Sequence, residues 1–378
     1  MITFRRFRTA APATVWLAAV AGACTGAEPR AASGTDSLYV GVAAARGTRT
    51  EAYFNGVALA IEHLNARRAD GAPAFALRMP PDTVSQVAVA VAFRDDPAVI
   101  GVVGHTGSAQ TLEAAPIYAD VEGDGRRALV AVSPTATNPR VTASSEWVFR
   151  VCPTDDDVAQ ALARYVADSL GARRAAVIYR NDLFGRGFTR VFRAAFEGRG
   201  GRILERDPYL AGITEYEAYA ARIARGDAQA LVIAGGAEDA AQILRAMRAA
   251  GGALSALGTD DLAALHADPA AAREFTGLRY SAFFLPDRVV SEAAIRFVVD
   301  YRGRFGASPD HRAALAYDAA MLIGLAALDA GPDRAAIRDR IALVGRGSAP
   351  YAGATGTIRF NPAGDPVEKD VWVARIAP

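Results

Sequence analysis

The stretch AVIGVVGHTGSAQTLEAAPIY, residues 98–118, joins an apolar run to a helical segment through a short loop of glycine and polar residues. The run 98–103 has the continuous apolar character of a β-strand that is buried on both faces. We expect a helix to begin near Ser108, because serine is a preferred residue at the N-cap of a helix. A buried strand, a polar loop and a helix in this order indicate one unit of an α/β fold.

The same order of strand and helix recurs on both sides of this stretch. Expected strands cover residues 38–42, 128–132, 175–179 and 229–234, and expected helices cover 51–67, 82–94, 185–197 and 237–250. This alternation predicts doubly wound parallel sheets with helices on both faces. Because about 350 ordered residues exceed what a single core usually holds, we expect two α/β lobes.

The composition is that of an ordinary globular protein, with 51% hydrophobic and 22% charged residues among 378. Forty-two basic residues stand against 41 acidic ones, which gives a net charge of +1. A chain so close to neutral offers no electrostatic basis for binding nucleic acid, so we expect no nucleic-acid partner. Lys369 is the only lysine. With arginine supplying all other basic residues, a single arginine says little about function.

The first 24 residues resemble a bacterial export signal. Three arginines precede the apolar stretch 10–23, which is shorter than the run of about 20 residues that a membrane-spanning helix needs. Small residues then precede Cys24, as in the lipobox of bacterial lipoproteins, and residues 25–36 have the composition of a flexible tether. We expect a protein of the periplasm or cell envelope that is anchored to a membrane by lipid on Cys24, with a freely soluble periplasmic protein as the alternative. Cys152 then has no partner and is expected to be a buried thiol.

Motifs of the common catalytic sites are absent from the sequence. There is no Gly-x-Gly-x-x-Gly turn opening a helix, no phosphate-binding P-loop, no Gly-x-Ser-x-Gly turn, no His-Glu-x-x-His and no Cys-x-x-Cys. The four histidines lack the spacing of metal ligands; they are His63, His105, His266 and His311. We therefore expect a protein that is not an enzyme and that requires no metal or other cofactor.

Two polar loops follow neighbouring strands of the predicted sheet. The loop 104–109 precedes a helix, whose free N–H groups and positive dipole end suit a carboxylate, and Ser108 adds a hydroxyl donor. The alternative for Ser108 is an ordinary N-cap. A second loop, 133–139, follows the next strand, at the carboxyl edge of the sheet where open α/β folds bind ligands. Two adjacent polar loops predict a binding site at this edge.

These loops belong to a series of motifs that resembles the periplasmic solute-binding proteins of branched-chain amino acid ABC transporters. The similar motifs extend over about residues 37–376, in the order found in that family: VVGH (102–105), AAPIY (114–118), SP (133–134), TNP (137–139), VFRVCP (148–153), DD (155–156), FGRG (184–187), GG (235–236), QILR (242–245), GTD (258–260) and YDA (317–319). The resemblance implies a type I periplasmic binding fold, in which two lobes joined by hinge strands clamp a small molecule between them. Lobe one is expected to comprise 37–154 and 284–348, and lobe two 155–283 and 349–378.

The resemblance also implies the roles of individual residues. Ser108 and Thr137 are expected to hold a ligand carboxylate together with backbone amides of the two loops. The backbone carbonyl of Thr135 and the carboxylate of Asp260 are expected to hold a ligand ammonium, and Asp261 competes with Asp260 for this role. Hydroxyls and a helix start match a negative group, and an acidic side chain matches a positive one.

The chain departs from the family pattern where the ligand side chain is expected. Arg49 stands where the family usually has an aromatic residue, Phe184 takes the place of a tyrosine, and Ala237 follows the glycine pair where tyrosine is common. These changes leave open which side chain the ligand carries. Arg49 is either a selector of an acidic side chain or one of many surface arginines.

The function implied by the resemblance is capture of an amino acid or a similar small zwitterion between the lobes. Ligand-driven closure then presents the protein to a membrane permease, whose ATPase subunits supply the energy. The alternative from another class is a ligand-sensing receptor or regulator component that binds an amide, a urea-like molecule or a carboxylate.

Overall fold

The computed structural model describes residues 37–45, 47, 50–82, 85–210, 212 and 215–377. The predicted export signal with Cys24, the predicted tether and Arg49 lie outside the described residues.

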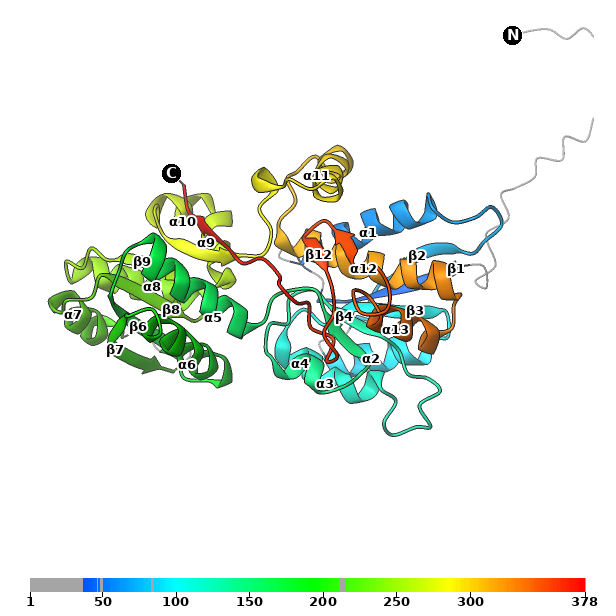
Figure 1. Cartoon of the computed structure of the whole chain (residues 1–378), viewed down its shortest axis with the longest axis horizontal. Coiled ribbons are helices and arrows are strands. Elements are labelled where there is room, and N and C mark those ends of the chain that lie inside the picture. The colour runs from blue at the N-terminus through cyan, green and yellow to red at the C-terminus, as the bar shows by residue number, and fades with distance from the viewer. Residues whose placement is uncertain are drawn as a thin grey trace, which may run out of the picture. The chain divides into compact units, whose positions relative to one another are not determined.

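A parallel five-stranded sheet in the order β2-β1-β3-β4-β5 forms the centre of the first lobe (Figure 1). Its strands are β1 (Ser37–Ala43), β2 (Ala74–Arg78), β3 (Val99–Gly104), β4 (Ala131–Ser133) and β5 (Val148–Arg150). The helices of this lobe are α1 (Glu51–Asn65), α2 (Gln86–Asp95), α3 (Ser108–Tyr118), α4 (Arg140–Ala143), α11 (Glu292–Phe305), α12 (His311–Ala330) and α13 (Arg334–Ala342). Helices α1 and α12 pack on one face of the sheet, and α2 and α3 pack on the other.

Strand β3 is buried along its whole length, as its continuous apolar run predicts. Gly101 lets α12 approach closely, because a Cβ atom at this position would lie 2.7 Å from Cγ2 of Ile323. Among the described helices, α12 is the one long and apolar enough to cross a membrane, and 78% of its apolar window is buried within the protein. Packing against β3 and α1 accounts for that apolar composition.

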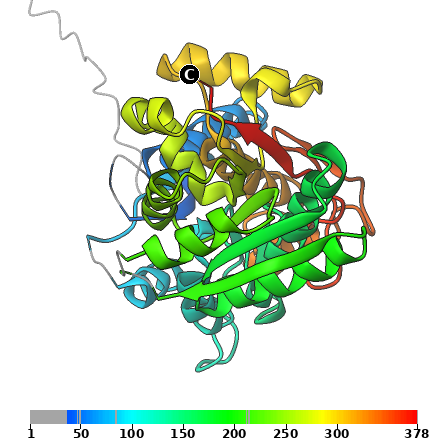
Figure 2. The same ribbon diagram turned by 90° about the vertical axis from the view of Figure 1, so that its left-hand side faces the viewer.

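The second lobe contains a six-stranded sheet in the order β13-β10-β9-β8-β6-β7, seen from its own side in Figure 2. Its strands are β6 (Arg174–Arg180), β7 (Arg202–Tyr209), β8 (Ala230–Ala234), β9 (Ser255–Gly258), β10 (Arg279–Ala282) and β13 (Trp372–Arg375), and only β13 is antiparallel to its neighbour. The helices are α5 (Asp155–Arg164), α6 (Leu183–Glu197), α7 (Glu217–Arg225), α8 (Ala237–Ala249), α9 (Ala263–Ala267) and α10 (Pro269–Glu274). Two sheets with helices on both faces, parallel except for the antiparallel edge strand β13, confirm the predicted fold class.

Helix α6 is fixed to its sheet by phenylalanines spaced four residues apart. Phe188, Phe192 and Phe196 are fully buried, and successive ring centroids lie 6.1 and 5.7 Å apart. Phe184 extends this row toward the start of the helix, with its ring 5.9 Å from that of Phe188. The i, i+4 spacing places all four rings on one helix face, so the apolar row positions the first turn of α6.

The chain first leaves the first sheet through residues 151–154. Cys152 lies there and is fully buried, as predicted. Immediately afterwards Thr154 and Asp157 cap α5 reciprocally, the Thr154 hydroxyl accepting from the Asp157 N–H at 3.1 Å and the Asp157 carboxylate accepting from the Thr154 N–H at 2.9 Å. This double cap fixes the start of α5 directly after the segment that leaves the first sheet.

The C-terminal segment contacts the first lobe before it reaches the second sheet. Strands β11 (Tyr351–Gly353) and β12 (Gly356–Ile358) form a hairpin whose turn donates two backbone hydrogen bonds to Asp318 of α12. Asp365 forms an ion pair with Arg150 of β5. Residues 354, 355 and 365 thus contact the first lobe, although the expected boundary near residue 349 assigns them to lobe two. The division into lobes stays a prediction, and the contacts favour a last crossing between residues 366 and 372.

Candidate ligand-binding site

A cavity of about 470 Å³ lies where loops of the two sheets meet. Loops that follow β3 and β4 line it from the first lobe, and loops that follow β6 and β9 line it from the second. All four loops leave the carboxyl ends of parallel strands, which is where open α/β sheets hold their ligands. The cavity is therefore the candidate site.

Five of the predicted site residues line this cavity: Ser108, Thr135, Thr137, Phe184 and Asp260. Ala237 does not line it. As the first residue of α8, Ala237 packs against the apolar core on the far face of the second sheet. Ser108, Thr135 and Thr137 of the first lobe thus meet Phe184 and Asp260 of the second at this cavity. Ala237 instead packs against the core.

Ser108 is the first residue of α3, and the N-cap position belongs to Gly107. The alternative interpretation of Ser108 as an ordinary N-cap is therefore wrong, because the cap lies one residue earlier. Its hydroxyl instead accepts a hydrogen bond of 3.2 Å from the backbone N–H of Asn138. Gly107 has no side chain to cap the helix, so the first N–H groups of α3 have no side-chain acceptor from the N-cap. An anion at this helix start would find a hydroxyl and the positive end of the helix dipole.

The hydroxyl of Thr135 joins the two loops and contacts a residue that the sequence analysis did not select. It donates to the carbonyl oxygen of Thr106 at 2.7 Å, and the hydroxyl of Tyr53 in α1 lies 2.9 Å from Oγ1 of Thr135. Because the Thr135 proton is used on Thr106, Tyr53 is the donor of the second bond. Burial raises the pKa of Tyr53 to about 12, which keeps this donor protonated at neutral pH.

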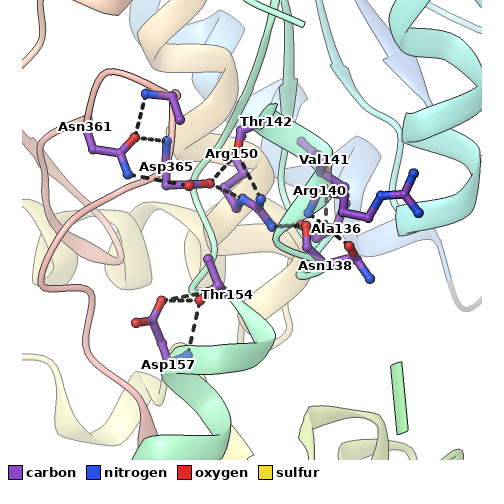
Figure 3. Close-up of polar contacts among 12 residues, drawn as sticks. Ala136, Asn138, Arg140, Val141, Thr142, Arg150, Thr154, Asp157, Asn361 and Asp365 are labelled. Carbon is purple, nitrogen blue, oxygen red and sulfur yellow. Dashed lines mark hydrogen bonds and ion pairs between the residues drawn. The ribbon is translucent and has the colours of Figure 1, made fainter. Parts of the chain in front are cut away.

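Arg150 holds the backbone on both sides of Thr137 (Figure 3). Its side chain is fully buried, and Nη1 donates to the carbonyl oxygens of Ala136 and Asn138, each at 2.8 Å. Nε forms a 2.6 Å ion pair with Asp365. A planar guanidinium with several fixed acceptors is rigid, so Arg150 fixes the orientation of the Thr137 peptide toward the cavity.

Asp155, at the start of α5, also lines the cavity and is only 6% exposed. Burial raises its pKa to about 6, although a hydrogen bond from the Thr137 side chain acts in the opposite direction. A hydroxyl has one proton to donate, so the Asp155 carboxylate and a ligand carboxylate compete for Thr137. The predicted role of Thr137 as a carboxylate donor thus depends on the state of Asp155.

Asp260 and Asp261 open a short 3₁₀ turn directly after β9. Burial in the cavity wall and the adjacent negative charge of Asp261 raise the pKa of Asp260 to about 8. Both causes disfavour the charged carboxylate, and a positive ligand group beside Asp260 would stabilise that charged form again. Nearby, Arg180 forms an ion pair of 2.5 Å with Asp182, so this guanidinium already has a carboxylate partner on its own lobe.

Polar residues that line the site and were not predicted include Asp155, Arg180, Asp182 and Thr259, and Tyr53 supports the lining through its bond to Thr135. Asp155 and Arg180 could have been found by position, since each stands at the carboxyl end of a strand or at the following helix start. Tyr53 offers no such signal, because it lies in the apolar face of α1. Among the described residues, no group of three or more His, Cys, Asp or Glu side chains is arranged to hold a metal ion.

Comparisons with known proteins agree with this architecture. An amino acid binding protein of Pseudomonas aeruginosa is 30% identical over 205 residues, and the match covers 53% of this chain and 53% of that relative. This chain thus matches about half the length of that curated relative. A solved structure of a putative branched-chain amino acid ABC transporter from Rhodospirillum rubrum is 28% identical, with a TM-score of 0.70 over 90% of this chain and 98% of that one.

A second solved structure shows the same fold at lower identity. It is the substrate-binding protein of a branched-chain amino acid transporter from Streptococcus pneumoniae, in complex with isoleucine. It is 22% identical to this chain, with a TM-score of 0.77, and the match covers 90% of this chain and 96% of that one. A family model described as periplasmic binding protein matches residues 41–377, nearly all of the described chain. The chain belongs to this family of periplasmic binding proteins, which bind solutes and are not enzymes.

Proposed function

We propose that the protein is the solute-binding component of an ABC transporter, which captures an amino acid in the cavity between its lobes and delivers it to a permease. The observation that carries the proposal is the pairing of opposite chemistries across one cavity. The first lobe contributes the start of α3 with Ser108, and the second contributes Asp260. The names of the relatives, an amino acid binding protein among them, support the same substrate class.

Electrostatics orients the ligand in this site. Its carboxylate lies at the start of α3, where the helix dipole and the Ser108 hydroxyl favour negative charge. Its ammonium lies at Asp260, whose charged carboxylate is disfavoured by burial and by Asp261 and would be stabilised by a positive neighbour. Burying an unpaired charge in a closed cavity costs several kcal/mol of binding free energy. A group of opposite charge beside it can offset a cost of this size. The site therefore favours a zwitterion over a neutral molecule.

A zwitterion held in this way couples binding to closure. Its two charged ends contact different lobes, so it interacts more strongly with a closed arrangement than with an open one, and binding shifts the population toward closure. The closed form is what a permease would recognise, and the ATP-hydrolysing subunits would supply the energy of transport.

Periplasmic binding proteins are extracytoplasmic, which agrees with the export signal expected at the start of the chain. We propose further that lipid on Cys24 anchors the protein to a membrane, because small residues precede this cysteine and a tether-like segment follows it. Stable anchoring takes more than one acyl chain, as a lipoprotein cysteine provides.

Calorimetric titration of the purified protein tests the proposal. The ligands are the common amino acids, the amides of the tightest-binding ones, and the carboxylic acids that lack their amino groups. We expect an amino acid to bind at least tenfold more tightly than its amide and its des-amino acid. Tighter binding of a neutral amide or a simple carboxylate would contradict the proposal and favour a ligand-sensing role.

A further inference from the structure

A second cavity, of about 370 Å³, lies in the second lobe at the opposite edge of its sheet. The amino ends of β9 and β10 reach it through Ser255 and Arg279, whereas the candidate ligand site lies at the carboxyl end of β9. Three arginines line it, Arg248, Arg279 and Arg375, and no aspartate or glutamate does. The cavity is therefore positively charged and separate from the amino acid site.

Two of these arginines face each other across neighbouring strands. In the antiparallel pairing of β10 with β13, Arg279 is directly opposite Arg375. Residues directly opposite each other in such a pair point to the same face of the sheet, and like charges there are destabilising. Within the described part of the chain, neither guanidinium forms an ion pair with a carboxylate. Arg279 is half-buried and Arg375 is exposed, so an anion from solvent can reach the pair and neutralise the repulsion.

The two guanidinium groups converge on Gly277. Nη1 of Arg279 donates to the carbonyl oxygen of Gly277 at 3.4 Å, and Nη2 of Arg375 lies 3.5 Å from where a Cβ atom on Gly277 would stand. Nε of Arg279 is buried and has no hydrogen-bond partner among the described residues. A buried donor without a partner costs free energy, and an anion placed between the two side chains would supply the missing acceptor.

Arg248 differs from this pair because a neighbouring residue already engages it. Its Nη2 donates to the carbonyl oxygen of Glu274 at 2.9 Å, and its Nη1 lies 3.8 Å from Oε1 of Glu274. The unbalanced positive charge of the cavity thus belongs to Arg279 and Arg375.

The rest of the lining is suited to an apolar group. Leu244 and Leu254 are half-buried and line the same cavity. We propose that this cavity binds a small organic carboxylate, with its charged group between Arg279 and Arg375 and its apolar part against these leucines. Bidentate recognition of carboxylates is the characteristic chemistry of arginine, and a cavity of this size admits a chain of a few carbons.

Isothermal titration of the whole protein with sodium hexanoate tests the site, with hexan-1-ol as the uncharged ligand of the same length. We expect hexanoate to bind the wild type and hexan-1-ol to bind at least tenfold more weakly. Arg375→Gln and Arg279→Gln should each weaken hexanoate at least tenfold and leave amino acid binding unchanged. The matched control is Arg190→Gln on the exposed side of α6, which should bind hexanoate like the wild type.

A double variant, Ser108→Ala with Thr137→Ala, separates this site from the amino acid site. Hexanoate binding that survives in this variant and is lost in Arg375→Gln supports the second cavity. The reverse pattern would place the carboxylate in the amino acid site and overturn the inference while leaving the proposed function intact. Failure of hexanoate to bind the wild type at about ten millimolar, where even a millimolar affinity is measurable, would also overturn it.

Discussion

Arg150 and Asp365 form an ion pair of 2.6 Å between β5 and the segment that leads to β13. The same guanidinium donates to two carbonyl oxygens of the loop 133–139, which lines the ligand cavity. One buried side chain thus connects the candidate site with a segment that continues into the second lobe. Movement of that segment during closure would act directly on the backbone that flanks Thr137.

Asp365→Asn removes the counter-charge of a fully buried guanidinium. Breaking a buried ion pair from one side typically costs about 3 kcal/mol or more, because the remaining charge stays buried without compensation. We expect that loss in the free energy of unfolding by urea. The matched control is Glu146→Gln, whose partner Arg338 lies 3.3 Å away at the surface, and its cost should be below about 1 kcal/mol. Equal costs for the two variants would show that the buried pair has no special importance.

Gly101→Ala tests the close packing of α12 on β3. The new methyl group would lie 2.7 Å from Cγ2 of Ile323 and 3.2 Å from Cγ1 of Val130, both in the core. Overpacking of this kind costs about 1 to 3 kcal/mol in the free energy of unfolding. Gly303→Ala in α11 is the control, since no atom lies within 4 Å of its new methyl group, and it should stabilise the protein by up to about 1 kcal/mol. A stabilising Gly101→Ala would contradict the packing described for β3.

Ser108→Ala removes a hydroxyl from the start of α3. Hydrogen bonds to charged groups contribute about 1.5 to 3 kcal/mol, so amino acid binding should weaken by roughly 10- to 150-fold in calorimetry. Ser291→Ala is the matched control: this serine caps α11, accepting from the Ala294 N–H at 3.2 Å. It should lower the free energy of unfolding by about 1 kcal/mol and leave binding unchanged. Unaltered affinity in Ser108→Ala would exclude this hydroxyl from the site.

Asp155 makes stability depend on pH. Because its pKa is raised from 3.8 to about 6 in the folded protein, the folded state binds a proton more tightly than the unfolded state. This group therefore lowers the free energy of unfolding as pH rises from about 4 to about 6, by up to about 3 kcal/mol, and the loss persists at higher pH. Asp155→Asn removes the effect, so the stability of the variant relative to wild type should rise over this range in urea unfolding. A difference that is constant between pH 4 and pH 7 would contradict the raised pKa.

Much of the fold could be predicted because buried strands and amphipathic helices leave a regular pattern in the sequence. The strands expected at 175–179 and 229–234 occur at Arg174–Arg180 and Ala230–Ala234, and the helix expected at 237–250 occurs at Ala237–Ala249. The C-terminal segment could not be assigned to a lobe from the sequence, because its contacts depend on single polar residues. Asp318 holds that segment from 36 residues away in sequence, and Asp365 within the segment pairs with Arg150, which is 215 residues away.

The sequence predicts those parts of the candidate site where polar loops follow the ends of strands. It does not predict contacts that depend on how separate helices pack beside these loops. Ser108, Thr135 and Thr137 line the cavity, and their roles toward a ligand stay predictions. Local sequence contains no information on the Tyr53 hydroxyl that reaches Thr135, since this contact depends on how α1 packs beside the sheet. Local sequence also does not reveal that the Thr137 hydroxyl donates a hydrogen bond to Asp155. That bond forms only because α5 starts beside the loop 133–139.

The central claim is that Asp260 of the second lobe binds the ammonium of a ligand whose carboxylate lies on the first. Calorimetric titration of Asp260→Asn with the tightest-binding amino acid tests it most directly, with Asp261→Asn as the matched control. The account predicts a loss of about 2 to 5 kcal/mol in binding for Asp260→Asn, since a buried charge pair is broken, and a smaller loss for Asp261→Asn. Wild-type affinity in Asp260→Asn would contradict the claim.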